Sequence, residues 1–500
     1  MKLETLAVSA SARLVQNVNT RRAVDITGIT CDSRSVRLGD LFAALPGVKI
    51  DGAQFSKQAA QRGAAAILCE HEDPQIELPQ LVCSDARLAL AKAARAFYGH
   101  ADLRMRLGAV TGTNGKTTSA YLVRHILNHS SRQCGMLGTI EYDLGSEVIP
   151  APLTTPESLD LHRYLRTMAD SGCDSAFMET SSHSLCQHRV AGIHFDAAIF
   201  TNLTQDHLDY HRTMADYRDA KATLFRNLLP DSTAILNLDD PNADYFANNT
   251  HARVMGFTIR GGNTSPFGLN AELAATIRHM SIHGTSFGLE SPWGNREIHI
   301  QSAGAHNVQN ALGALAAAII LGAKFDDALA ALESFKGVPG RLEPVEFPQV
   351  GRALPFRVFV DYAHTEDALR SVMKALREVK PSRVITVFGC GGDRDRSKRP
   401  KMGRAVEDMA DLGVITSDNP RTEDPNAILD EICSGIKSPG KFIVEPDRAK
   451  AIAMAINEAR ADDVVLIAGK GHENYQIFGK EKRHFSDVEE ALAALKTRFS

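Results

Sequence analysis

The sequence contains no C-x-x-C pair, and its 8 cysteines are scattered along 500 residues. Closely paired cysteines are the usual sign of a zinc site or a thiol redox motif, so the sequence argues against both. Scattered thiols suit a reducing compartment, and we expect a cytoplasmic protein. The first residues, Met1 to Thr5, also lack the basic and then apolar pattern of a signal peptide.

Long apolar runs and an excess of charge are missing as well. No window approaches about 18 uncharged apolar residues, and the closest, residues 311–323, fits a buried helix. The formal net charge of −4 at pH 7 provides no global field for nucleic acid. We therefore expect neither a membrane nor a nucleic-acid partner. The short basic cluster of residues 394–401 is interleaved with acids, and it is either a local anion site or a solvated loop.

The sequence does contain a glycine-rich turn, in the stretch Gly108-Ala-Val-Thr-Gly-Thr-Asn-Gly-Lys-Thr-Thr118. An apolar segment enters this turn and a helical pattern leaves it, which is typical of a phosphate-binding loop. The match is incomplete, because the pattern G-x-x-x-x-G-K-[ST] requires a glycine where this sequence has Val110. A glycine-rich β-to-α turn with a chance lysine is the alternative. The residues expected to bind nucleotide phosphates are Gly112, Thr113, Asn114, Gly115, Lys116, Thr117 and Thr118.

Length and periodicity predict three α/β domains, because 500 residues are too many for one core. We expect a small α/β domain in residues 1–98, a central P-loop domain with a mostly parallel sheet in residues 99–340, and a Rossmann-like C-terminal domain in residues 341–500. The predicted strands of the second and third domains are 107–110, 175–178, 197–200, 234–238, 356–361, 383–389, 412–417 and 464–469.

Polar residues follow these predicted strands, at the edge of an open α/β sheet where ligands bind. One of these segments, Gly389-Cys-Gly-Gly392, lacks the third glycine of a dinucleotide fingerprint, so we reject a nicotinamide site. The polar segments after strands are 179–189, 201–211, 362–364, 390–395, 418–421 and 470–473.

Together these motifs resemble the Mur ligase family, ATP-dependent enzymes that add amino acids to the UDP-muramyl peptide of peptidoglycan. The resemblance covers essentially the whole chain. It is most specific in Thr111 to Thr118, Lys221-Ala-Thr-Leu-Phe225, Asp418-Asn-Pro-Arg421 and Gly471-His-Glu473. Within the family, the chain is most similar to members that add meso-diaminopimelate to UDP-N-acetylmuramoyl-L-alanyl-D-glutamate. The resemblance implies a monomer that uses ATP and Mg²⁺, forms an acyl phosphate, and serves peptidoglycan synthesis, cell shape and cell division.

The resemblance also implies the catalytic group. Lys221 is expected to react with CO₂, because a carbamate would turn a cation that repels metal into an anionic oxygen ligand. Such modification requires a lowered lysine pKa, and hence burial or nearby cations. From the residues alone, Glu179 could instead cap a helix, His207 could be an ordinary partly buried histidine, and Lys221 could be a surface lysine. The implied catalytic residues are Lys116, Glu179, His207 and Lys221, and the implied metal ligands are Thr117, Glu179, His207 and the carbamate of Lys221.

The substrate residues follow from the same resemblance. For ATP it implies Asn307 and Asn310 on the adenine side, Arg341 at a phosphate and Asp361 at the ribose; Arg341 could instead form an interdomain salt bridge. For the UDP-muramyl peptide it implies Cys31, Ser33, residues 48–50, Thr154, Thr155, Ser181, Gln187 and Arg189. For diaminopimelate it implies Arg394 and Arg421 at the distal carboxylate, Asp418, Asn419 and Glu473 at the distal ammonium, and the adjoining Pro420 and Gly469.

Other functions compete with this prediction. A lysine-adding sibling or a folylpolyglutamate synthase is the nearest, but lysine-adding relatives have no arginine at the position of Arg421. A P-loop ATPase acting as a motor or switch, and a protein that only binds a nucleotide sugar, are alternatives from other classes. One departure from the family is Glu366, which stands where proline usually follows Asp361-Tyr-Ala-His-Thr365. This change affects local rigidity more than chemistry.

Overall fold

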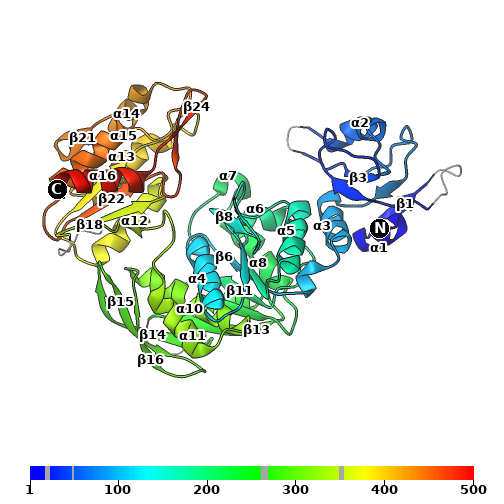
Figure 1. The fold of residues 1–500 in the computed structure, drawn as a ribbon, viewed down its shortest axis with the longest axis horizontal. Helices are drawn as coiled ribbons and strands as arrows, with labels where there is room; N and C mark the ends of the chain where they lie inside the picture. Colours follow the sequence, from blue (N-terminus) through cyan, green and yellow to red (C-terminus); the bar gives the residue numbers. More distant parts are fainter. Residues whose placement is uncertain (17–22, 48–49, 261–267, 348–353) are drawn as a thin grey trace. The chain divides into compact units, whose positions relative to one another are not determined.

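The computed structural model describes residues 1–16, 23–47, 50–260, 268–347 and 354–500. The chain folds into two compact units, Met1–Ala274 with Asn310–Ala331, and Ala275–Gln309 with Leu332–Ser500. Figure 1 traces the chain from the blue N-terminus to the red C-terminus. The predicted α/β class with mostly parallel sheets is confirmed. The predicted domain limits at residues 98 and 340 stay predictions.

The first unit begins with a small sheet in the order β1-β5-β4-β3-β2, in which only β1 is antiparallel to its neighbour. Helix α3 (Ala86–Phe97) buries its alanine-rich side, and Asp85 caps it by accepting the N–H of Leu88. The remaining elements are α1 (Leu3–Ala10), β1 (Arg13–Val15), β2 (Gly28–Thr30), β3 (Asp40–Ala43), η2 (Gly52–Phe55), α2 (Ser56–Gln61), β4 (Ala66–Cys69), β5 (Gln80–Val82) and η3 (Ala101–Leu103).

The larger sheet of the first unit has the order β13-β12-β11-β6-β10-β7-β8-β9. The four predicted strands of the central domain are confirmed as β6 (Arg106–Thr111), β10 (Ser175–Glu179), β11 (Ala197–Phe200) and β12 (Thr233–Asn237). Because β6 lies between the parallel strands β10 and β11, the polar residues after these three strands meet at one edge. The other elements are α4 (Lys116–His129), β7 (Cys134–Leu137), β8 (Glu141–Asp143), β9 (Val148–Pro150), α5 (Ser158–Asp170), α6 (Ser182–Cys186), α7 (Leu208–His211), α8 (Met214–Arg226), α9 (Ala243–Ala247), β13 (Arg253–Thr258), α10 (Ala305–Ile320) and α11 (Phe325–Ser334).

Residues 271–300 depart from the expected alternation of strands and helices. They form β14 (Ala271–Ser281), β15 (Gly284–Glu290) and β16 (Arg296–Ile300), and β15 pairs with β16 in antiparallel orientation. The pairing of Phe287 with Ile298 places two apolar side chains opposite each other, and both are buried. This extension was not predicted from the sequence.

The sheet of the second unit has the order β17-β18-β22-β19-β20-β21, with only β17 antiparallel. The predicted strands are confirmed as β18 (Arg357–Asp361), β19 (Val384–Phe388), β20 (Leu412–Ile415) and β22 (Val464–Ala468). One apolar cluster joins this sheet to α12 (Glu366–Glu378), α13 (Lys398–Met409) and α14 (Pro425–Cys433), and another joins it to α15 (Arg448–Glu458) and α16 (Asp487–Phe499). The remaining elements are β17 (Glu343–Pro344), η4 (Pro439–Lys441), β21 (Phe442–Val444) and an unpredicted hairpin of β23 (Tyr475–Phe478) and β24 (Glu481–His484).

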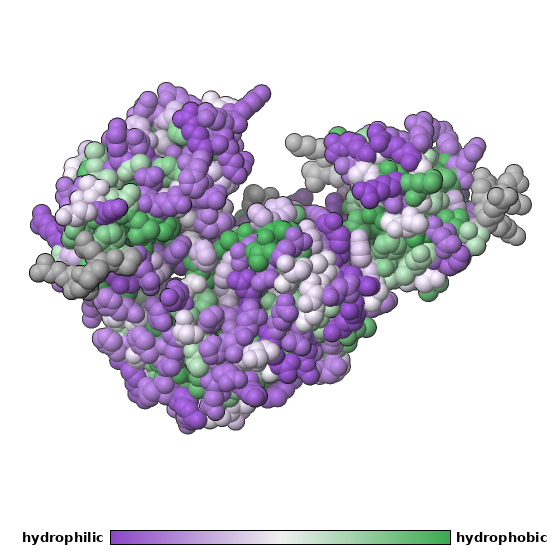
Figure 2. Space-filling model, in the orientation of Figure 1, coloured by the Kyte–Doolittle hydropathy of each residue, from purple (hydrophilic) through white to green (hydrophobic). Residues whose placement is uncertain are grey.

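Neighbouring residues along the strands of this sheet face opposite layers. Phe359 belongs to the cluster with α12 to α14, whereas Val358 and Val360 belong to the cluster with α15 and α16. Helices therefore cover both faces, and the carboxyl ends of the strands remain free to carry polar loops. Figure 2 shows that the visible surface is mostly hydrophilic, with smaller hydrophobic areas between purple ones. Among the described residues, no helix has the length and apolar character needed to cross a membrane.

Candidate active site

The predicted phosphate loop lies between β6 and α4 in the first unit. Its helix begins at Lys116, so unpaired N–H groups of the first turn point toward the loop. Gly115 has φ of 88°, and a Cβ at this position would lie 2.4 Å from Oδ1 of Asn310. Only glycine fits there, because both the backbone angle and the neighbouring amide exclude a side chain. The Nζ of Lys116 donates to the carbonyls of Gly112 and Thr113 at 2.9 and 2.8 Å, so the lysine is folded over its own loop.

Lys221 of α8 lies beneath the same loop. Its side chain is buried, and its Nζ donates to the carbonyl of Gly112 at 2.8 Å. The ammonium also lies 4.5 Å from the centre of the Tyr217 ring. Burial, and then the positive charge of Lys116, hold the pKa of Lys221 well below its usual value, while Asp206 acts in the opposite direction. The lowered pKa that carbamate formation requires is therefore present. The alternative of a surface lysine is wrong.

Glu179 is a buried carboxylate at the carboxyl end of β10. Its Oε2 accepts hydrogen bonds from Thr117 Oγ1 at 3.1 Å and Thr139 Oγ1 at 3.0 Å, and its Oε1 accepts the N–H of Thr139 at 2.8 Å. The alternative of a helix-capping acid is wrong, because the cap of α6 is Ser181, whose side chain accepts the N–H of Ser184. The structure thus joins two of the predicted metal ligands, Thr117 and Glu179.

His207 lies in a group of aromatic rings. It has φ of 52° and an exposed side chain, and it precedes α7. Its ring lies 5.0 Å from the ring of His183 and 6.2 Å from that of Tyr217, centre to centre. Among the described residues, no group of three or more histidine, cysteine, aspartate or glutamate side chains has metal-binding geometry. The role of His207 as a metal ligand stays a prediction.

The residues predicted to hold the muramyl peptide surround the strand end that carries Glu179. Thr155 Oγ1 donates to the carbonyl of Glu179 at 2.8 Å and accepts the N–H of Ser181 at 3.1 Å. The guanidinium of Arg189 donates to Gln187 Oε1, donates to the carbonyl of Thr155, and pairs with Glu157. Four of the five predicted residues of this domain therefore form one network: Thr155, Ser181, Gln187 and Arg189. The fifth, Thr154, accepts from Thr139 at 3.2 Å and so adjoins Glu179 as well.

The predicted residues of the N-terminal domain and of α10 have simpler surroundings. Cys31 is exposed, whereas Ser33 is buried and donates to Gln58 Oε1 at 2.7 Å. Residues 48 and 49, which belong to the predicted segment 48–50, lie outside the described residues. Asn307 donates to the carbonyl of Ala303 at 2.8 Å, and Asn310 lies against Gly115, as described above.

In the second unit, Arg341 and Asp361 lie next to each other at the start of the sheet edge. The guanidinium of Arg341 lies 5.1 Å from the centre of the Tyr362 ring. Asp361 is buried, and its two oxygens accept the N–H groups of Leu342 and Ala363 at 2.7 and 2.8 Å. Burial raises the pKa of Asp361, and Arg341 opposes this shift. The backbone bonds of Asp361 fix the turn that carries Arg341, whereas its predicted contact with ribose stays a prediction.

The two arginines predicted to bind the distal carboxylate, Arg394 and Arg421, lie at the same corner of the second unit. A Cβ placed on Gly391 would lie 2.9 Å from Nη1 of Arg421 and 3.9 Å from Cγ of Arg394. Arg421 has φ of 53°, and its Nη1 donates to the carbonyl of Gly392 at 2.7 Å. Backbone bonds from Arg421 to Ile477 and from Gly479 to Arg421 attach this residue to the β23–β24 hairpin.

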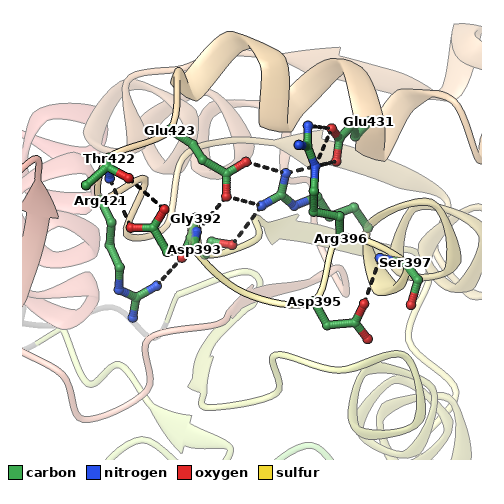
Figure 3. A network of polar contacts seen from close by, with 11 residues as sticks. Gly392, Asp393, Asp395, Arg396, Ser397, Arg421, Thr422, Glu423 and Glu431 are labelled. Carbon is green, nitrogen blue, oxygen red and sulfur yellow. Dashed lines mark hydrogen bonds and ion pairs between the residues drawn. The ribbon is translucent and has the colours of Figure 1, made fainter.

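A polar network centred on one buried arginine supports that corner (Figure 3). Arg399 is fully buried and donates to both oxygens of Glu423, to Glu431 and to the carbonyl of Gly391. Glu423 accepts the N–H of Asp393, and Asp393 accepts from the backbone and the hydroxyl of Thr422. The Arg399 side chain, mainly through its hydrogen bonds, holds the pKa of Glu423 down at about 2. The loops after β19 and β20 are therefore tied together, and with them Arg394 and Arg421.

The predicted ammonium-binding residues Asp418, Asn419 and Glu473 also meet in the structure. Asn419 Nδ2 donates to Glu473 Oε2 at 3.1 Å, and Asn419 Oδ1 accepts the N–H of Ile477 at 3.0 Å. Burial raises the pKa of Tyr475, the charge of Glu473 raises it further, and Arg421 opposes the shift. Tyr475 therefore lies near both the carboxylate of Glu473 and the guanidinium of Arg421. Gly469 has φ of 120°, and the buried Pro420, next to the half-buried Arg421, completes the predicted set.

Sequence reasoning missed several residues that the structure places among the predicted ones. Tyr217, Arg399 and Lys470 are buried polar side chains that contact Lys221, Glu423 and Asp418, respectively. Lys470 lies inside a polar segment that the strand-end rule had marked. The position of Lys470 directly after a buried strand was a signal that could have identified it. The sequence does not show, however, which residues these buried side chains contact.

The turn between β6 and α4 defines a nucleotide-binding α/β protein of the P-loop class. Models of the Mur ligase family match three segments: the family catalytic domain at residues 25–98, the middle domain at 110–318, and the glutamate ligase domain at 340–471. The chain belongs to the Mur ligase family.

Similar proteins agree with this assignment. A UDP-N-acetylmuramoyl-L-alanyl-D-glutamate–2,6-diaminopimelate ligase of Geobacter metallireducens is 43% identical over 95% of both chains. A protein of the same name from Bacillus velezensis is 42% identical over 99% of both chains. The solved structure of a ligase with this name is 34% identical, covers 95% of this chain and 96% of its own, and has a TM-score of 0.69.

Proposed function

We propose that this protein catalyses the ATP-dependent addition of meso-diaminopimelate to UDP-N-acetylmuramoyl-L-alanyl-D-glutamate. The observation that carries the proposal is the corner of the second unit where Arg394 and Arg421 lie together, beside Asn419, which bonds to Glu473. An ammonium and a carboxylate on one carbon need an acid and an arginine side by side, and a guanidinium matches a carboxylate well. The names of the relatives support the same substrate.

The reaction requires activation of a carboxylate, because joining a carboxylate to an amine in water is uphill. The D-glutamyl carboxylate attacks the γ-phosphorus of ATP, ADP leaves, and an acyl phosphate forms. The uncharged amine of the incoming amino acid then attacks the acyl carbon, phosphate leaves, and the nitrogen loses a proton. Lys116 and the N–H groups of the loop before α4 are suited to hold the phosphate oxygens.

Arg189 is the residue best placed to orient the peptide substrate. Its guanidinium donates hydrogen bonds to Gln187 and to the carbonyl of Thr155, which orient it close to the strand end that carries Glu179. In the structure it pairs with Glu157. A substrate carboxylate can replace that partner, since the exchange of one carboxylate for another keeps the guanidinium paired.

Thr117 and Glu179 would hold Mg²⁺ at the phosphate loop. They fit it because Mg²⁺ prefers oxygen ligands and because a buried carboxylate next to a hydroxyl is a suitable donor pair. The ion would neutralise charge on the transferring phosphate. His207 is the third proposed ligand.

Lys221 is proposed to carry a carbamate. Its neutral amine would form a bond from Nζ to the carbon of CO₂, and one proton would leave to solvent. Two observations favour this reaction over a permanent ammonium: the pKa of Lys221 is lowered, and its Nζ bonds to a backbone carbonyl.

A substrate panel tests the proposed function. The purified protein is incubated with ATP, Mg²⁺, the UDP-dipeptide and either meso-diaminopimelate, lysine or ornithine, and phosphate release and product mass are measured. We expect amide product with meso-diaminopimelate and kcat/KM lower by at least about 100-fold with lysine, the scale of a site built for a polar group that the analogue lacks. Preference for lysine would indicate the sibling ligase, and ATP hydrolysis without an acceptor would indicate a motor or switch.

A further inference from the structure

Lys470 is a fully buried lysine at the carboxyl end of β22, among the residues proposed to bind the distal ammonium of the substrate. Its Nζ lies 3.3 Å from Asp418 Oδ1, 3.5 Å from Glu473 Oε2 and 3.2 Å from Asn419 Oδ1. A protein ammonium therefore already sits between the carboxylates that are proposed to receive a second one.

The contacts of Asn419 show that this lysine also sets the geometry. Its amide oxygen accepts from Lys470 and from the N–H of Ile477, and its amide nitrogen donates to Glu473. The amide is thus oriented by its neighbours and holds Glu473 in place. The acceptors proposed for a substrate are the carboxylates of Asp418 and Glu473, and Glu473 also bonds to Tyr475.

The formal charges give the arrangement its meaning. Two carboxylates and one lysine, at −2 and +1, sum to −1. The neighbouring buried pair of Arg448 and Asp487 sums to zero. Arg421 adds a positive charge at the adjoining corner, and Arg394 another. One net negative charge beside positive arginines matches a zwitterion, whereas two net negative charges would favour a cation without a carboxylate.

We propose that Lys470 is a specificity-determining positioning residue: it balances one carboxylate so that the pocket favours the distal zwitterion of diaminopimelate over the distal cation of lysine. The inference rests on the proposed function. It assigns to Lys470 no contact with the substrate. This role accounts for a buried lysine in a site that is proposed to bind another ammonium group.

The test compares Lys470→Met with Lys470→Arg and with the wild type. The methionine variant keeps the bulk and removes the charge, so kcat/KM for meso-diaminopimelate should fall by at least about 30-fold, as expected when one member of a buried charge pair is removed. The ratio of kcat/KM for diaminopimelate to that for lysine should fall as well. Lys470→Arg should keep that ratio within a few fold of the wild type.

A double variant separates charge from shape. Lys470→Met with Glu473→Gln returns the pocket to −1, so its ratio should lie above that of Lys470→Met alone. If Lys470→Met does not fold, the double variant is compared with Glu473→Gln alone, whose pocket has a net charge of zero. The ratio of kcat/KM for diaminopimelate to that for lysine should be higher in Glu473→Gln than in the double variant. An equal or lower ratio in Glu473→Gln would overturn the proposal.

A matched control removes an ion pair at the opposite end of the same sheet. Arg383 precedes β19 and pairs with the buried Asp463, which precedes β22, at 2.6 Å. Arg383→Met should lower the thermal midpoint and leave the amino-acid ratio unchanged. A wild-type enzyme active with diaminopimelate, together with a folded Lys470→Met of unchanged ratio, overturns the inference alone. A wild type without diaminopimelate activity overturns the proposed function instead.

Discussion

Lys221 on helix α8 of the first unit and Lys470 after strand β22 of the second are both buried lysines, yet their surroundings are opposite. Lys221 donates to a backbone carbonyl and lies within the field of another cation, Lys116. Lys470 lies between two carboxylates and forms ion pairs with both. The same side chain at the same depth is therefore prepared for different chemistry.

The chemistry open to a buried lysine therefore depends on its counter-ions. Without a paired carboxylate, the charged form is penalised by burial, and the amine is available as a nucleophile. Between two carboxylates, the ammonium is a fixed charge that shapes a binding site. The first environment suits covalent modification, and the second suits recognition.

The largest effect should come from removing the lysine of the first unit. Lys221→Ala deletes the amine that would carry the carbamate, so we expect kcat to fall by at least about 100-fold, the scale for losing one group that stabilises transition-state charge. Short carboxylates such as acetate or propionate should restore part of the activity, because they can occupy the space as an anionic oxygen donor. Phosphate release with and without the added carboxylate measures both effects.

The control is Lys221→Arg, which keeps a cation and cannot form a carbamate. It should be as inactive as the alanine variant and should not respond to added carboxylate. Full activity of Lys221→Ala would remove the carbamate from the mechanism and would leave the comparison with Lys470 as one of packing alone.

A smaller effect is expected at the corner that faces the zwitterion. Arg421→Ala should cost about 2–4 kcal/mol in kcat/KM for diaminopimelate, the scale for stranding a charged partner. The KM for ATP should stay within a few fold of the wild type. Steady-state kinetics with each substrate varied in turn checks the result. Unchanged diaminopimelate kinetics would refute the role of Arg421.

The loops behind Arg421 should tolerate less change than a comparable exposed turn. A Cβ on Gly392 would lie 1.9 Å from the carbonyl oxygen of Pro420, so Gly392→Ala must move the loop that accepts from Arg421. We expect KM for diaminopimelate to rise by roughly 10-fold, equal to ~1.4 kcal/mol. Gly440→Ala is the matched control, because a Cβ there meets nothing within 4 Å. Equal behaviour of the two variants would show that the loop position does not matter.

Much of this arrangement could be predicted from the sequence, because it depends on local order along the chain. The eight apolar strands of the two main sheets were found from their composition, and the polar residues after them met at shared edges, as parallel pairing requires. Arg394 and Arg421 follow different strands, β19 and β20, and meet for this reason.

The rest could not be predicted, because it depends on pairing across distant segments. The β14–β16 extension and the β23–β24 hairpin break the strand–helix alternation that the prediction assumed. The partners of Lys470 lie 52 residues back at Asp418 and 3 residues ahead at Glu473, and no periodicity connects the three. Asp361 was predicted at the ribose, and that prediction does not show that its two oxygens already accept backbone N–H groups.

The smallest effect concerns stability and extends the comparison to an acid. Arg399 holds the pKa of Glu423 at about 2, below its usual 4.5, so the folded state binds this proton less readily than the unfolded chain does. The stabilising contribution is fully present above pH 4.5 and is lost as the pH falls toward 2. Glu423→Gln removes the charge, so its stability deficit relative to the wild type should be greatest near neutral pH and should shrink between pH 4.5 and 2. Urea unfolding at a series of pH values measures this difference. A deficit of constant size across that range would show that Arg399 gains nothing from the charge of Glu423, and that a counter-ion matters less in this loop than it does beside Lys470.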